Sequence, residues 1–481
     1  MGLIVAALAF PLLLKWHLPL LLLSWNATAV VFFLPGRPQL WLVMAFLSLA
    51  IAVMQRSLLS EMRFISARSI VLPLLFTVLV VFVTGKLTGG FGVRAFGSEK
   101  VGGRSYFMIF AGAAGLLAMT GYRVPPHRAV LYTGLFFLGS LSNVIGSMLS
   151  YVPQKLWYIF LIFPVDVGFV SSTISTISTP EEKIIRFYGL SLAAMGAFYY
   201  FLARHGVRGV LDRSKPHRLV LLISALLIVA AGGYRGFFIL LALTFLFLFY
   251  YEGLLRSRLG FGLLAAGLFG LALLFPLANR LPLSIQRTLS FLPLQIDPVA
   301  RLNAEKSTEW RLEMWNELMP EVKKYFFKPK GVEVSGIDLE LTDDLSKRGF
   351  ISSQQLAILA GNYHNGPLSV LITFGVWGFI GWVWFLIASV RALYRNYLYG
   401  EDYLKKINTF LLAYFVARIV FFFFVFGDLR TDFPIFTGIV GLALALNGGI
   451  CKAVRVHTLV KPVTLQRFQP TLKPAPELPR R

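Results

Sequence analysis

The sequence predicts an all-α polytopic membrane protein with about 12 transmembrane helices (range 11–14), and three observations support this. The 481 residues are 57% hydrophobic and only 14% charged, whereas a soluble protein carries about 25% charged residues. Apolar runs recur along most of the chain, and about 20 apolar residues cross the hydrocarbon core as a helix. Lys and Arg gather in some loops and not in others. An ordinary soluble enzyme, a disordered chain and a coiled coil are thereby excluded.

The apolar runs give twelve predicted spans. They cover residues 18–34, 38–55, 69–85, 104–121, 128–149, 187–203, 217–233, 235–252, 259–276, 366–391, 407–427 and 432–450. Residues 3–14 are apolar but short and contain Pro11, so they form either a thirteenth span or an interfacial helix. Residues 155–180 begin apolar, then meet Pro164 and Asp166, which favours a re-entrant or interfacial segment.

Basic residues orient these spans. Five basic segments fall on one side if residues 155–180 do not cross the membrane, and the positive-inside rule places that side in the cytoplasm. The segments are residues 56–68, 123–128, 204–218, 391–406 and the tail from Lys452. Residues 277–365 then form a long loop on the outer side.

The outer loop divides the chain into four predicted parts. Residues 1–276 form an N-terminal transmembrane bundle, 277–365 an outer loop domain, 366–450 the C-terminal spans, and 451–481 a basic, Pro-containing tail, predicted to be disordered, cytoplasmic and close to membrane lipids. The loop is charge-balanced, with 11 basic and 11 acidic residues. The net charge of +23 therefore lies outside it and indicates membrane orientation rather than nucleic-acid binding.

Two helices are predicted inside the outer loop. Thr308 is the predicted cap of a helix from Glu309 to about Met319, and a second helix covers residues 352–361. Spacing of four places Arg311 and Trp315 on one stripe of the first helix, and Glu309, Glu313 and Glu317 on another.

Three charged residues stand in or beside apolar spans, where charges are costly: Asp166, Arg235 and Arg418. Arg235 follows Gly232-Gly233-Tyr234 in an outer turn, where it could bind a phosphate or simply contact lipid phosphates. Arg418 lies in mid-span and needs either a partner, for which Asp166 is a candidate, or a ligand. For Asp428, Arg430 and Asp432 the favoured interpretation is a solvated network at the outer end of a span.

Of the six histidines, only His364 is placed on the outer side. A neutral imidazole there could accept a proton from a hydroxyl, and Asn365 could orient it, although a lone histidine is more often structural. The single cysteine, Cys451, excludes an intrachain disulfide and a cysteine-based metal site. No P-loop, His-Glu-x-x-His, Gly-x-Ser-x-Gly or Asp-x-Asp motif occurs, so no metal and no cofactor are expected.

The order of these motifs resembles the bacterial O-antigen ligase and O-antigen polymerase superfamily of membrane glycosyltransferases. A Tyr-Arg-Gly turn at Arg235 precedes Arg311-x-x-x-Trp315 in a long outer loop. Pro329 and Gly331, then His364-Asn365, then Gly375-Val376-Trp377-Gly378 follow in that order. The resemblance covers roughly residues 217–395. Where the family often has Gly-x-Gly after Pro329, this chain continues Gly331-Val332-Glu333.

The resemblance implies a GT-C-like helical fold in the bacterial inner membrane, with the long loop and the active site facing the periplasm. Its members transfer a glycan from an undecaprenyl-diphosphate-linked donor to a saccharide acceptor without a metal. By resemblance, Arg235 and Arg311 would bind the diphosphate, and His364 would activate the acceptor hydroxyl. Trp315, Asn365 and Arg418 are further candidates for substrate binding.

The sequence leaves open both the acceptor and some alternative classes of protein. The acceptor could be a lipid-linked repeat, as in a polymerase for O-antigen or exopolysaccharide, or lipid A-core, as in a ligase; the first is slightly favoured. A protein O-glycosyltransferase is a weaker possibility. A transporter or flippase of lipid-linked glycan would also have many spans and buried arginines, but the long charge-balanced loop and the lack of a sequence repeat argue against it. Other polysaccharide-assembly proteins are possible partners, and a non-catalytic assembly factor is the remaining alternative.

Overall fold

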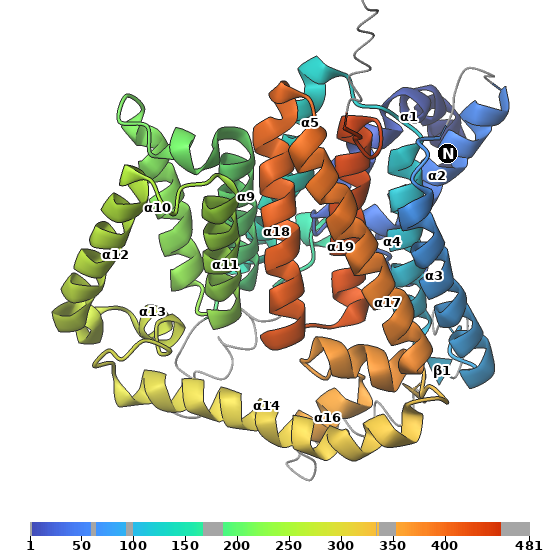
Figure 1. Ribbon diagram of the computed structural model, residues 1–481. Helices are drawn as coiled ribbons and strands as arrows, with labels where there is room; N and C mark the ends of the chain where they lie inside the picture. Colours follow the sequence, from blue (N-terminus) through green and yellow to red (C-terminus); the bar gives the residue numbers. More distant parts are fainter. Residues whose placement is uncertain are drawn as a thin grey trace, which may run out of the picture.

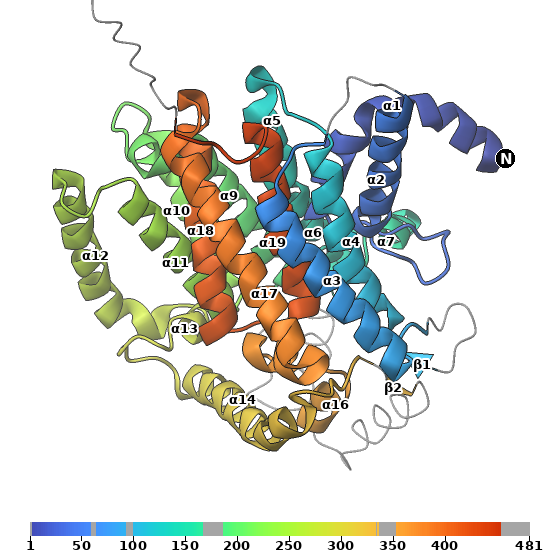
Figure 2. The ribbon, with the colours of Figure 1, turned by 45° about the vertical axis from the view of Figure 1, so that its right-hand side comes forward.

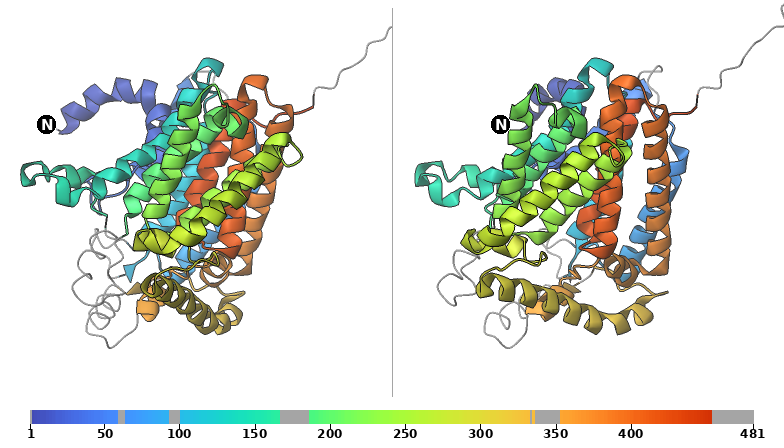
Figure 3. Two further views of the ribbon diagram at one scale, coloured as in Figure 1. Left: turned by 90° about the vertical axis from the view of Figure 1, so that its left-hand side faces the viewer. Right: turned by 60° about the vertical axis from the view of Figure 1, so that its left-hand side comes forward.

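A computed structural model describes residues 2–58, 64–92, 100–166, 186–332, 334–335 and 353–453. Long helices form a bundle, and one further long helix, α14 (Pro298–Tyr325), lies across one end of it (Figure 1). The two views of Figure 3 show the same arrangement from other sides, with α14 below the ends of the bundle helices. The outer loop therefore contains a structured platform at one end of the molecule.

The bundle helices are α1 (Gly2–Trp25), α2 (Leu40–Leu58), α3 (Arg68–Thr88), α4 (Gly103–Thr120), α5 (Ala129–Leu138), α9 (Tyr188–Val210), α10 (Pro216–Ala231), α11 (Arg235–Tyr251), α12 (Arg258–Leu277), α17 (Gly366–Tyr399), α18 (Lys405–Phe424) and α19 (Leu429–Asn447). Shorter helices are α6 (Asn143–Gly146), α7 (Ile159–Ile162), α13 (Leu283–Thr288) and α16 (Ser353–Leu359). Two-residue strands, β1 (Lys100–Val101) and β2 (Val334–Ser335), pair antiparallel. Short 3₁₀ turns lie at Pro126–Arg128, Gly139–Ser142, Leu149–Tyr151, Gln154–Leu156, Ala278–Arg280 and Asp402–Leu404.

The prediction of a mostly helical membrane protein is confirmed. By length and composition, seven helical segments of the described ranges can cross a membrane, and α10 and α11 are apolar but shorter. Twelve crossings stay a prediction. The helix predicted over residues 18–34 is wrong at both ends, because α1 runs from Gly2 to Trp25 and includes residues 3–14. Its first turns extend away from the bundle (Figure 2).

Glycines bring α4 and α19 into close contact at the centre of the bundle. A Cβ atom on Gly112 would lie 3.0 Å from the ring of Phe433, and one on Gly441 would lie 2.7 Å from the sulfur of Met119. Helices in lipid associate through such small residues because their backbones can then approach. The indole of Trp25 donates a hydrogen bond of 3.1 Å to the carbonyl of Pro434, which adds α1 to this centre.

A kink in α17 attaches the platform to the bundle. Gly375 has φ +67°, and a Cβ atom there would lie 2.8 Å from the carbonyl oxygen of Phe326, at the end of α14. The amide of Val376 donates to the same oxygen at 2.7 Å. Only glycine takes this conformation readily, so the predicted span 366–391 consists of two helical parts that meet at Gly375.

The helix predicted from Glu309 begins earlier. The carboxylate of Asp297 accepts a hydrogen bond of 2.8 Å from the amide of Val299, and Pro298 occupies the first turn of α14. This Asp-Pro start fits a helix N-terminus, so the prediction of Thr308 as the cap is wrong. Pro320 is included inside α14, which ends at Tyr325. The second predicted helix, 352–361, corresponds to α16.

Of the segment 155–180, the structure describes residues up to 166, which contain a 3₁₀ turn and α7; the rest lies outside the described residues, so the re-entrant placement stays a prediction. Helix α12 has no buried residue and lies at the edge of the bundle (Figure 1). The predicted C-terminal tail falls outside the described residues from 454 onward.

Candidate functional site

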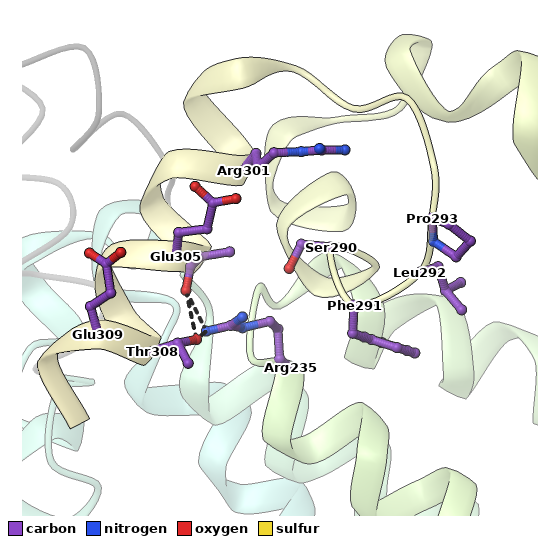
Figure 4. A pocket seen from close by; sticks show the side chains of 10 residues that line it. Arg235, Ser290, Phe291, Leu292, Pro293, Arg301, Glu305, Thr308 and Glu309 are labelled. Carbon is purple, nitrogen blue, oxygen red and sulfur yellow. Dashed lines mark hydrogen bonds between the residues drawn. The ribbon is translucent and has the colours of Figure 1, made fainter. Parts of the chain in front are cut away.

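The turn that contains Arg235 lies against α14. Gly233 has φ +76°, which lets the chain reverse between α10 and α11, and Arg235 is the first residue of α11. Its Nη2 donates to the carbonyl oxygen of Ala304 at 2.9 Å and to Oγ1 of Thr308 at 3.3 Å (Figure 4). The guanidinium of Arg235 is therefore held between the bundle and the platform, with neutral oxygen atoms as its hydrogen-bond partners.

Helix α14 presents Arg311 toward the bundle. Arg311 and Trp315 are half-buried, whereas the glutamates at 309, 313 and 317 are exposed, as the spacing of four predicted. Met314 and Leu318 are buried against Tyr363 and the first part of α17. The Arg311 guanidinium lies 5.9 Å from the ring centre of Phe426. Within the described ranges, it makes no hydrogen bond or ion pair.

The loop between α16 and α17 fixes His364. Its φ of +49° is a left-handed conformation that non-glycine residues seldom adopt. The indole of Trp315 donates to the Tyr363 carbonyl at 3.0 Å, and the Asn365 side chain accepts from the Leu368 amide at 3.1 Å as the cap of α17. Trp315 and Asn365 thus hold the backbone on either side of His364, and the side-chain oxygen of Asn365 bonds to the backbone rather than to the imidazole.

The His364 imidazole lies among aromatic rings. Its centre is 5.2 Å from the ring of Trp310 and 5.0 Å from that of Phe426. Its Nδ1 is buried and has no hydrogen-bond partner among the described residues. Burial, and then the positive charge of Arg311, lower the pKa of His364 to about 4, which Asp428 partly opposes. The imidazole is therefore neutral near pH 7 and can accept a proton.

A cavity of about 980 Å³ brings these side chains together. Its charged or titratable lining residues are Asp166, Arg186, Tyr188, Tyr234, Arg235, Arg287, Arg311, His364, Arg418 and Asp432. Of the site residues predicted from the sequence, Arg235, Arg311, His364 and Arg418 line this cavity, whereas Trp315 and Asn365 do not. Five arginines face two aspartates, which leaves a formal excess of three positive charges.

Arg287 and Arg186 extend the cationic lining. Arg287 is 4% exposed; its Nε donates to Oδ1 of Asn303 at 2.7 Å, and its Nη1 donates to the Gly233 carbonyl. Arg186 donates to the same Asn303 oxygen at 3.2 Å. Burial, then the positive charges of Arg186, Arg235 and Arg311, lower the pKa of Arg287 to about 9. The low pKa of Arg287 thus reflects burial first and the neighbouring cations second.

These two arginines were not among the site residues predicted from the sequence. Arg186 directly precedes the predicted span 187–203 on the outer side, so the criterion that found Arg235, an arginine at the outer end of a span, would also have found it. Arg287 is one of eleven basic residues in the outer loop, and no local pattern distinguishes it from the others.

Arg418 has a carboxylate partner. Its Nη1 lies 3.6 Å from Oδ1 of Asp432, and both side chains are nearly buried. Asp166 instead accepts hydrogen bonds of 2.9 Å from the Ser147 hydroxyl and from the Gly189 amide at the start of α9. The suggested pairing of Arg418 with Asp166 is therefore wrong for the described residues, because Asp432 on the neighbouring helix α19 supplies the negative charge.

Asp428 and Arg430 form a buried network, so the interpretation of a solvated network is wrong. Asp428 and Asp432 are each 6% exposed. Arg430 donates to Asp428 at 2.7 Å and to the carbonyls of Ala360 and Gly361 at 3.0 and 2.8 Å. These bonds connect the start of α19 to the end of α16, three residues before His364.

Fold and site together define a class of protein: a multi-pass helical membrane protein whose cavity, under a loop platform, combines several arginines with a neutral imidazole. Residues 219–383 match the family model described as O-antigen ligase. This match confirms the resemblance found in the sequence: the segment from residue 219 to residue 383 is similar to the O-antigen ligase family. The matched segment contains Arg235, Arg287, Arg311 and His364. No curated protein matches the chain.

Proposed function

We propose that the protein transfers a glycan from an undecaprenyl-diphosphate-linked donor to a saccharide acceptor at the periplasmic face of the bacterial inner membrane. The observation that carries this proposal is the convergence of Arg235, Arg311 and His364, three residues from separate parts of the chain, on one cavity with an excess of positive charge. An anionic donor fits the arginines, and a hydroxyl acceptor fits the neutral imidazole.

The proposed reaction is a displacement at the anomeric carbon of the donor. The acceptor oxygen forms a bond to this carbon while His364 takes the hydroxyl proton. The bond from the anomeric carbon to the phosphate oxygen breaks, and its electron pair leaves with undecaprenyl diphosphate. Arg235 and Arg311 stabilise the charge that develops on the leaving group, a role that needs no metal ion.

Donor binding would also strengthen the base. Arg311 contributes to the low pKa of His364 in the protein without ligand. A diphosphate beside Arg311 brings negative charge into the same cavity, which favours protonated imidazole and raises the pKa of His364. The imidazole would then accept the acceptor proton more readily once the donor is in place, which couples the two substrates.

The periplasmic placement follows from the charge asymmetry of the loops. The cavity lies under α14, at the end of the bundle that contains the outer loop, where lipid-linked donors but not nucleotide sugars would be available. Among acceptors we favour a lipid-linked repeat, which would make the enzyme a polymerase for O-antigen or exopolysaccharide. Lipid A-core is the acceptor to compare with it.

In vitro transfer with purified protein tests the proposal. The assay contains undecaprenyl-diphosphate oligosaccharide, a chelator, and either a second lipid-linked repeat or lipid A-core. His364→Ala should lower the rate by about 10²-fold or more. The matched control is His217→Ala. His217 is exposed and lies at the start of α10, whereas the Arg235 turn follows the end of that helix. This variant should keep the wild-type rate. A wild-type rate in His364→Ala would refute the role of His364 as base.

A further inference from the structure

A second cavity, of about 500 Å³, adjoins the Arg235 guanidinium. It lies between the segment after α13 and the first turns of α14. Figure 4 shows Ser290 and Phe291 on one side and Arg301, Glu305 and Glu309 on the other, with Arg235 between them. The cavity is therefore formed by the outer loop and by the same arginine that enters the large cavity.

The charges of this second cavity balance. Arg235 and Arg301 face Glu305 and Glu309, two cations against two carboxylates, in contrast with the cationic excess of the large cavity. Carboxylates accept hydrogen bonds and guanidinium groups donate them. A ligand that carries many hydroxyl groups can satisfy both, whereas a diphosphate would be repelled by the glutamates.

Two further side chains fit a sugar. Phe291 is 51% exposed and lines the cavity, so its ring offers an apolar surface to the C–H face of a sugar ring. The Ser290 hydroxyl is buried and has no hydrogen-bond partner among the described residues. A buried hydroxyl without a partner is unfavourable, and a ligand hydroxyl in this cavity would supply the missing bond.

The two cavities share three lining residues, Arg235, Phe291 and Thr308, whereas His364 lines only the large one. We propose that the second cavity binds the sugar residues of the donor, next to the diphosphate that Arg235 holds. This proposal rests on the proposed function. The acceptor is assigned to the side of His364, because its hydroxyl must reach the imidazole.

Kinetics of two conservative variants test the assignment. Glu305→Gln and Phe291→Leu should each raise KM for the lipid-linked donor about fivefold to tenfold, with KM for the acceptor changed less than twofold. Neither variant should alter inhibition by a polyprenyl diphosphate that carries no sugar. Glu313→Gln, on the exposed face of the same helix, is the matched control and should behave as wild type.

The outcomes separate the two proposals. If the wild-type protein transfers glycan but both variants keep the wild-type KM for the donor, the second cavity does not bind its sugars. A rise confined to KM for the acceptor, or an equal loss of affinity for the sugar-free diphosphate, would also overturn the assignment. If the wild-type protein transfers no glycan at all, the proposed function fails and this inference fails with it.

Discussion

The large cavity has two ends whose arginines are held in different ways. At the end deep in the bundle, Arg418 lies 3.6 Å from the carboxylate of Asp432 and near the ring of Tyr414. At the end under α14, Arg235 and Arg287 donate to carbonyl, hydroxyl and amide oxygens, which carry no charge. Arg311 has neither a hydrogen bond nor an ion pair within the described ranges.

The difference shows how position decides the use of a charge. An arginine within a span is costly in lipid, so it is found with a counter-charge from a neighbouring helix. Under α14, Arg235 and Arg287 are held by neutral oxygen atoms, and within the described residues neither they nor Arg311 form an ion pair with a carboxylate. Their charge is then available to an anionic ligand. We therefore propose a structural role for Arg418, which the sequence had left between structure and ligand binding, and a donor-binding role for Arg235 and Arg311.

Removal of the counter-charge in the bundle should have the largest effect. Asp432→Asn leaves Arg418 buried without its carboxylate, and we expect the free energy of unfolding to fall by about 3–5 kcal/mol. Denaturant or thermal unfolding in detergent micelles measures this. The double variant Arg418→Met/Asp432→Asn should recover most of the loss. Equal stability of Asp432→Asn and wild type would show that the pair does not hold the bundle together.

Loss of a cation under α14 should instead reduce activity and leave stability nearly unchanged. Arg311→Ala should lower kcat/KM for the donor by about 10²-fold, because the departing diphosphate loses one charge partner. Arg311→Lys keeps the charge but not the planar geometry and should recover part of the rate. The matched control is Lys323→Ala, an exposed cation on the same helix. Normal turnover by a folded Arg311→Ala protein would contradict the comparison.

Arg287 should have a smaller, indirect effect. It connects the Gly233 carbonyl to Asn303 on α14, so it positions the neighbouring Arg235 against the platform. Arg287→Ala should raise KM for the donor about tenfold through misplacement of Arg235. A double-mutant cycle with Asn303→Ala measures the coupling. Fully additive effects of the two substitutions would show that Arg287 does not act through Asn303.

The smallest effect concerns pH. The active form of His364 is neutral and its pKa in the free protein is about 4, so kcat/KM should rise with pH through this value. Above it the imidazole is already deprotonated, and the profile should be nearly flat from about one unit above the pKa to pH 7. An acid limb centred near the ordinary histidine pKa of about 6.5 would show that His364 is not buried beside Arg311 as described.

Much of the fold follows from the sequence, because apolar runs of sufficient length predict helices without knowledge of their neighbours. Each of the twelve predicted spans overlaps a helix, although α1 begins and ends earlier than residues 18–34. The start of α14 was predicted wrongly because the chain contains two competing signals for a helix N-terminus. Thr308 resembled a helix cap, but Asp297 and Pro298 start the helix further upstream.

The site was only partly predictable, for a related reason. Arg235 and His364 were singled out by their predicted positions on the outer side and by their chemistry, and Arg311 by its spacing from Trp315; only the order of family motifs linked the three to one reaction. The pairing of Arg418 with Asp432 and the contacts of Arg287 with Gly233 and Asn303 depend on which helices are neighbours. Residue spacing along one chain does not contain that information.

Direct binding of a short-chain polyprenyl diphosphate to the purified protein tests the central claim, that arginines without carboxylate partners hold the donor diphosphate. The measurement compares wild type, Arg311→Ala and Lys323→Ala in a chelator-containing buffer. We expect Arg311→Ala to raise Kd at least tenfold, and Lys323→Ala to keep the wild-type value. The same Kd for wild type and a folded Arg311→Ala protein would contradict the claim.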